Sequence, residues 1–118
     1  MDQQVFDIKA RTFNFSLAVI KLAGGLQTTS SARILSRQLV RSATSIGANL
    51  VEGSSASSKK DFINYYHISL KSARETECWL RLLDETGLAN GIDEVSILRR
   101  ELDEIVRILV SSVVKLKK

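Results

Sequence analysis

Proline is absent from this 118-residue sequence, and cysteine, histidine and tryptophan occur once each. Without proline nothing interrupts a long helix, so the composition favours helices over a sheet with its turns. The lone Cys78 has no partner for an internal disulfide. One histidine and one cysteine are also too few to assemble a zinc site within one chain. We therefore expect neither a metal nor a cofactor.

Long apolar runs and targeting signals are missing as well. No apolar stretch approaches the roughly 20 residues that a membrane helix requires. Asp2 places an acid where a signal peptide needs a base, and no long apolar segment follows it. A single free thiol is typical of a reducing compartment. The sequence thus predicts a protein of the cytoplasm that has no membrane partner.

The length and charge set wide limits on function. A chain of 118 residues suits one domain, residues 1–118, that folds without disulfides. The net charge of +4 and the isoelectric point of about 9.5 are compatible with a nucleic acid or another anionic partner. They are equally compatible with ordinary surface charge.

Apolar residues at helical spacing predict a helix from Val5 to Ala23 and a second that ends near Gly53. The first carries one row at Phe6, Phe13, Leu17 and Ile20, and a second row at Ile8, Phe15 and Leu22. We expect Gly24-Gly25 to end it with a left-handed cap. The residues from Thr28 to Ser31 supply cap candidates for the second helix. Its predicted core stripe is Leu35, Leu39, Ala43, Ile46 and Leu50.

Two further helices follow the serine-rich loop. Ser58 and Asp61 have the spacing of a capping box for a helix from about Lys59 to Thr86. Its predicted inner face is Phe62, Tyr65, Ser69, Ser72, Ala73, Thr76, Leu80 and Leu83, with small residues in the middle that allow a close neighbour. Asn90 and Asp93 are candidate caps for the last helix. That helix has a near-heptad stripe at Val95, Leu98, Leu102, Ile105, Leu109, Val113 and Leu116. Short loops between helices of similar length predict an all-α, antiparallel, up-down-up-down four-helix bundle.

The usual catalytic arrangements are missing from this pattern. Cys78 and His67 are eleven residues apart on one predicted helix, or roughly 16 Å, too far for a nucleophile and its base. We expect both to be ordinary helix residues, with Cys78 packed. Glu75 and Glu77 point in different directions and cannot share a substrate. A di-iron bundle needs a glutamate three residues before its histidine, where this chain has Asn64. The sequence therefore predicts a protein that is not an enzyme.

Arginines form a stripe on the second predicted helix. Arg33, Arg37 and Arg41 follow one another at steps of four, nearly opposite the apolar core stripe, and this helix has no acid before Glu52. Exposed guanidinium groups bind phosphates through bidentate hydrogen bonds, so the stripe is a candidate nucleic-acid site. Lys59 and Lys60 are further candidates. The alternatives are a solvated face, or a face that meets acids of another helix or subunit.

Polar residues of the same helix have a structural interpretation. We expect Arg41 to bridge to Glu52 or Glu77, and Asn49 to satisfy polar groups between helices. Apolar residues are also predicted on outward faces, where a monomer leaves them in water: Val40, Ala48, Val51, Ile97, Ile108 and Val110. Such residues favour an oligomer.

The segment from Gln38 to Gly53, QLVRSATSIGANLVEG, resembles the signature of the four-helix-bundle proteins first named as 23S rRNA intervening-sequence proteins. That family includes accessory proteins of diversity-generating retroelements. Asp61-Phe62 and the run from Glu75 to Leu83 are similar to its third helix. Val40 replaces an arginine that is common in the family, which weakens the basic patch, and Gly47 stands where many members have proline.

The resemblance implies a ring-shaped homopentamer. In the retroelement branch it also implies a basic surface that binds nucleic acid and a reverse transcriptase. Two hypotheses result. The first is a homo-oligomer whose basic face contacts RNA or DNA through Arg33, Arg37 and Arg41. The second is a scaffold for a protein partner, in which these arginines make ion pairs between subunits.

Overall fold

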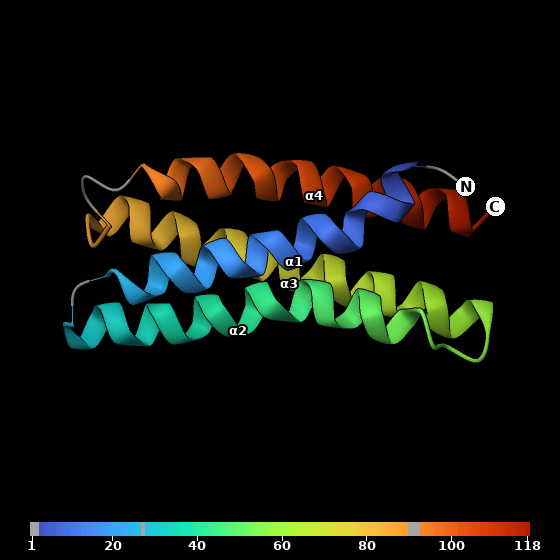
Figure 1. Ribbon diagram of the computed structural model, residues 1–118, viewed down its shortest axis with the longest axis horizontal. Coiled ribbons are helices and arrows are strands. Elements are labelled where there is room, and N and C mark those ends of the chain that lie inside the picture. Colours follow the sequence, from blue (N-terminus) through green and yellow to red (C-terminus); the bar gives the residue numbers. More distant parts are fainter. Residues whose placement is uncertain (1–2, 27, 90–92) are drawn as a thin grey trace.

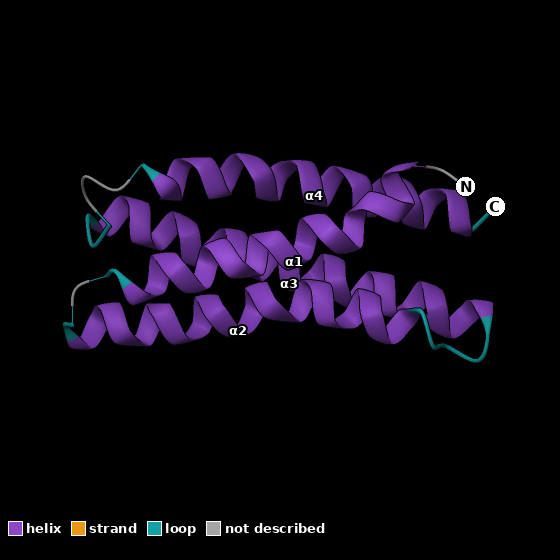
Figure 2. Cartoon of the chain, viewed as in Figure 1, coloured by secondary structure: helices purple, strands orange, loops and turns teal. Residues whose placement is uncertain are grey.

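The chain folds into four antiparallel helices. The structure, a computed structural model, describes residues 3–26, 28–89 and 93–118, with side chains from Ile8 onward. The helices are α1 (Gln3–Gly24), α2 (Ser30–Gly53), α3 (Lys59–Thr86) and α4 (Glu94–Leu116). They alternate in direction along a body of 45 × 21 × 19 Å (Figure 1). No strand occurs among the described residues (Figure 2). The predicted all-α, up-down-up-down bundle is confirmed.

The helices pack in a closed cycle. α1 contacts α2 and α4, and α3 contacts the same two helices. Seen end-on, the bundle is therefore a square in which α1 lies diagonally across from α3, and α2 across from α4. Each helix turns one side to the core and the opposite side to the outside.

Two predicted N-caps are present. The Thr29 hydroxyl accepts a hydrogen bond from the Ala32 backbone N–H at 3.2 Å, and the Ser58 hydroxyl accepts from that of Asp61 at 3.1 Å. These bonds satisfy N–H groups that the first turn of a helix leaves without a partner. The capping box at Ser58 is only half formed, because the Asp61 carboxylate accepts from the Ser57 hydroxyl instead of reaching back.

The predicted left-handed cap at Gly24-Gly25 is wrong. Gly87, after α3, is the glycine with positive φ among the described residues, at 74°. Gly25 closes α1 with a tight turn, its N–H donating to the Leu22 carbonyl at 3.1 Å. Asp93 precedes α4 without a side-chain cap bond. The predicted cap Asn90 lies outside the described residues.

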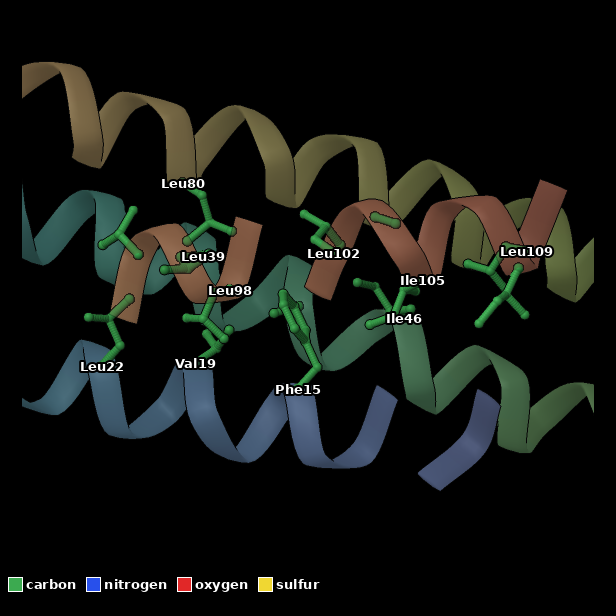
Figure 3. Packing of buried hydrophobic residues seen from close by; sticks show 14 of the residues in the cluster. Phe15, Val19, Leu22, Leu39, Ile46, Leu80, Leu98, Leu102, Ile105 and Leu109 are labelled. Atoms are coloured by element: carbon green, nitrogen blue, oxygen red, sulfur yellow. The ribbon is translucent and has the colours of Figure 1, made fainter. Parts of the chain in front are cut away.

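The core is a continuous apolar layer between the four helices (Figure 3). The predicted stripes of α2 and α4 are buried, apart from half-buried Leu35 and Leu116. On α3, Tyr66 is buried and Tyr65 only partly, so the inner face is turned by one residue there. Ile108, predicted to face outward, is buried, because α1 covers that side of α4.

One of the two apolar rows of α1 is buried, and the other is exposed. Ile8, Phe15, Val19 and Leu22 are buried in the core. Phe13, Leu17 and Ile20 are between 44% and 64% exposed. We name these three residues the α1 stripe. The side chain of Phe6, predicted for the same row, is outside the described residues.

Small residues form the seam between α2 and α3. The buried Thr76 hydroxyl donates to the Ser42 hydroxyl at 2.9 Å, and Ser45 and Ser72 share a hydrogen bond of 3.0 Å. The Ser69 hydroxyl donates to the Ile46 carbonyl at 2.8 Å. The predicted close approach of a neighbour to the middle of α3 is thus made by α2. In the described ranges, no helix is both long enough and apolar enough to cross a membrane.

Phe13 and Phe15 provide a matched pair for the two rows of α1. Phe15 is 2% exposed and Phe13 64%. In dilute solution, we expect Phe15→Ala to lower the free energy of unfolding by about 3–5 kcal/mol, because it leaves a cavity in the core. Phe13→Ala should change it by about 0.5 kcal/mol or less. Urea unfolding followed by circular dichroism measures both, and equal losses would contradict the assignment of the rows.

Candidate nucleic-acid interface

Three exposed arginines line the outer side of α2. Arg33, Arg37 and Arg41 are spaced by about one helical turn each, because Leu39 and Ile46 bury the opposite side of the helix. Within the described part of the chain, the side chains of Arg33 and Arg37 make no hydrogen bond or ion pair. These two guanidinium groups therefore keep all their donors for a ligand.

Arg41 is engaged within the bundle. Its guanidinium donates to the Gln38 side chain at 2.8 and 3.1 Å and forms an ion pair with Glu75 on α3. Glu75 also accepts from the indole N–H of Trp79 at 3.1 Å. The predicted bridge from Arg41 to Glu52 or Glu77 is wrong, because the α2–α3 register brings Glu75 opposite Arg41. Arg41 is therefore less available to a phosphate than Arg33 or Arg37.

Lys59 and Lys60 lie apart from the arginine stripe. Both are exposed in the first turn of α3, at the end of the bundle where the loop after α2 turns back (Figure 1). At about 1.5 Å per residue, α2 alone separates Arg33 from Gly53 by about 30 Å. The candidate residues of the sequence thus form two sites, a stripe on α2 and a lysine pair at one end.

Glu75 and Glu77 point to different neighbours, as their spacing predicts. Glu75 pairs with Arg41 of α2, and Glu77 accepts from Arg99 of α4 at 2.9 Å. Hydrogen bonding to Glu77 raises the pKa of the Arg99 guanidinium above its usual value. Both carboxylates therefore serve as structural partners of arginines.

A groove between α3 and α4 was missed by the sequence reasoning. It has a volume of about 1040 Å³, and Arg74, Arg99 and Arg100 contribute to its walls together with Glu77, Asp103 and Glu104. The dibasic pair Arg99-Arg100 was the available signal. Because three acids balance the three arginines, this groove attracts anions less strongly than the α2 stripe.

The residues considered for catalysis or metal binding are dispersed. His67 and Cys78 are both exposed on α3, so the prediction that Cys78 is packed is wrong. Among the described residues, no three of the His, Cys, Asp and Glu side chains gather in a group that could hold a metal ion.

Asn49 is half-buried and acts mainly within its own helix. Its amide donates to the Ser45 carbonyl at 2.8 Å and to the Ser45 hydroxyl at 2.9 Å. The same hydroxyl bonds to Ser72 of α3, so Asn49 reaches the neighbouring helix through Ser45. Of the apolar residues predicted on the outer side of α2, Ala48 and Val51 are exposed and Val40 is half-buried.

Comparison with known proteins places the chain in a family and finds solved structures similar to it. The family described as 23S rRNA-intervening sequence protein matches residues 4–111. A crystal structure of a protein of unknown function, from the S23 ribosomal protein family of Bacteroides thetaiotaomicron, is 35% identical with a TM-score of 0.82. The similarity covers 90% of this chain and 97% of that one. No curated protein matches the chain.

Trp79 is the single tryptophan, so its fluorescence reports on the contact with Glu75 and Arg41. We expect Glu75→Ala to shift its emission to longer wavelength, because water replaces the carboxylate as partner of the indole N–H. The free energy of unfolding should fall by only about 0.2–1 kcal/mol, as for other exposed ion pairs. Glu85→Ala, which removes a carboxylate paired with Arg81, is the control and should leave the emission unchanged. An unshifted spectrum in Glu75→Ala would contradict the contact.

Proposed function

The chain belongs to the 23S rRNA-intervening sequence protein family, and from this we propose a non-enzymatic, homo-oligomeric protein of the cytoplasm whose basic face binds RNA or DNA. We propose an assembly of five copies in a ring, because the resemblance to this family implies one. The resemblance to the retroelement accessory proteins adds a reverse transcriptase as a proposed protein partner.

The observation that carries the proposal is the free pair Arg33 and Arg37. An exposed arginine offers a planar fork of donors that fits a phosphate, and here no acid within the described residues competes for it. The two guanidinium groups stand one turn apart on a rigid helix. Their geometry suits successive phosphates of a nucleic-acid backbone.

The stripe has no means of reading sequence. Trp79, which shares Glu75 as a partner with Arg41, is half-buried, and its indole N–H is used by that carboxylate. Bases need aromatic platforms or matched hydrogen-bonding groups to be distinguished, and phosphates do not. We therefore propose binding that is largely independent of sequence. One copy binds the nucleic acid weakly. An oligomer that repeats the stripe makes the contact multivalent and so raises the affinity.

The second candidate is a scaffold for a protein partner, without nucleic-acid binding. The pairing of Arg41 with Glu75 favours it, because it shows an arginine of the stripe already serving an ion pair. The exposed apolar residues of α1 favour it as well. Binding experiments with nucleic acid separate the two candidates.

We expect Arg33→Gln combined with Arg37→Gln to weaken binding to a labelled RNA and to a labelled duplex DNA. Each phosphate contact that is lost should reduce the slope of log affinity against log salt by about 1. Fluorescence anisotropy at low and near-physiological salt measures both quantities. Arg81→Gln with Arg107→Gln is the matched control, since it removes the same charge from arginines that pair within their own helices.

The control variant should keep the wild-type salt slope. If neither nucleic acid binds to the wild-type protein at low salt, the scaffold hypothesis stands alone. If the double replacement at 33 and 37 leaves binding intact, the basic surface lies elsewhere, at Lys59 and Lys60 or at the lysines that end the chain.

A further inference from the structure

The exposed apolar residues of α1 lie next to α2. Figure 1 shows the two helices side by side, and two residues of α1 fix their contact. Thr12 packs on Gly47, and the Ser16 hydroxyl donates to a carbonyl of α2 at 3.4 Å. Phe13 and Leu17 each follow one of these residues by about 100° around the helix, toward the outside. The α1 stripe therefore runs along the outer edge of the contact between α1 and α2.

The two helices form the basic half of the bundle. The segment from Ile8 to Val51 contains six lysines and arginines and no aspartate or glutamate. The acids that bound this segment, Asp7 and Glu52, belong to the end of the bundle away from Arg33. An anionic ligand therefore meets little repulsion along the outer side of α1 and α2.

Three of the six cations are directed to acids of the other helices. Arg11 pairs with an acid of α4, and Arg41 with an acid of α3. Lys21 lies on the α4 side of α1, where it lines a groove of about 340 Å³ together with Glu94. These three residues are turned away from the α1 stripe or already paired.

The other three cations stand beside the α1 stripe. Lys9 bonds to the neutral hydroxyl of Ser54 at one end of it. Arg33 and Arg37, at the other end, are the free pair described above. Gly47 follows Arg33 by 14 residues, so Arg33 is turned only about 40° from the side of α2 that contacts α1, and Arg37 about 80°. We name the α1 stripe together with Arg33 and Arg37 the α1/α2 face.

The contact between Thr12 and Gly47 also sets the distances along this face. Counted from there along the two antiparallel helices, at about 1.5 Å per residue, Ile20 and Arg37 stand within one helical turn of the same level. Phe13 is about 14 Å from the level of Arg37 and about 20 Å from that of Arg33. A ligand that contacts Phe13 and both arginines is therefore an extended one.

One class of ligand meets both features of the α1/α2 face. Nucleotide bases have flat apolar faces that stack on aromatic rings, and every nucleotide carries a negatively charged phosphate for an arginine. A duplex buries its base faces in its own stack and offers phosphates and groove edges. An amphipathic helix of a partner protein fits only if it also supplies acids opposite Arg33 and Arg37. A single strand supplies both groups along its whole length.

Resting on the nucleic-acid binding proposed above, we infer that the ligand of the α1/α2 face is a single strand, with a base stacked on Phe13 and phosphates on Arg33 and Arg37. Phe13 is 64% exposed, so its ring is open to a base. Leu17 and Ile20 lie between Phe13 and the arginines and contact the apolar faces of further bases. An exposed ring accepts any base, so stacking adds affinity without sequence preference. A duplex binds through the arginines alone.

Phe13→Leu tests the stacking contact, because it keeps an apolar side chain and removes the flat ring. The affinity for a labelled oligo(dT) or oligo(U) of about 12 nucleotides should fall about tenfold, and that for a duplex DNA of the same length should not change. Fluorescence anisotropy at low salt measures both affinities. Phe13→Tyr, which restores a ring, is the matched control and should bind the single strands like the wild-type protein. Circular dichroism checks that both variants keep their helices.

Phe13→Trp in a Trp79→Phe background reports on the contact directly. A base that stacks on an indole quenches its emission, so oligo(dT) should quench the emission of this variant and a duplex should not. Val114→Trp in the same background is the control, since Val114 is 54% exposed on α4, across the bundle from α2. Its emission should not change when oligo(dT) is added.

Equal losses for single strand and duplex in Phe13→Leu, or no loss for either, would overturn the inference and leave the arginine contacts of the proposed function intact. Phe13→Tyr that binds as weakly as Phe13→Leu would overturn it as well. If the indole at position 13 emits at short wavelength without ligand and oligo(dT) does not quench it, protein covers the α1 stripe, from a partner or another copy, and the inference is wrong. A wild-type protein that binds no nucleic acid would refute both proposals.

Discussion

Hydroxyl side chains hold α2 against α3, and the arrangement of the surface depends on that contact. Ser42 and Thr76 are fully buried and bonded to each other, and Ser45 and Ser72 repeat the contact one turn away. Small residues let two helices approach closely, and a buried hydroxyl without a partner costs about 1–3 kcal/mol. A shift of one helix along the other would break these bonds together. The register is therefore fixed more firmly than apolar packing alone would fix it.

This register decides which arginines are free. It brings Glu75 opposite Arg41, while Arg33 and Arg37, nearer the start of α2, find no acid among the described residues. The Arg41 pair is exposed and contributes little to stability, because solvent screens it and two long side chains must be held in place. The ion pair instead positions the Glu75 side chain, because it holds the carboxylate where the Trp79 indole N–H can donate to it.

The sequence predicted the helices and most of the core, because the apolar residues of α2 and α4 each form one predominant stripe that must face inward. It left open which row of α1 is inside, since both rows have helical spacing and only the neighbours choose between Phe13 and Phe15. The partner of Arg41 was predicted wrongly for a similar reason. Glu52, Glu75 and Glu77 are all plausible from periodicity, and only the register between α2 and α3 selects Glu75. The expected left-handed cap is not formed at Gly24-Gly25, because a tight turn closed by the Gly25 N–H ends α1 there.

In the ring that we propose, assembly and ligand binding depend on one another. Each copy carries a net charge of +4 and exposes Arg33 and Arg37, so assembly brings like charges together. Salt at physiological strength screens charges beyond about 8 Å, so the repulsion is moderate, and apolar contacts between copies would oppose it. A polyanion that spans several copies removes the repulsion, and it binds tightly only where several copies present their arginines. By linkage, a ligand that prefers the assembled form also stabilises that form, so the two guanidinium groups of each copy act through the ring rather than singly.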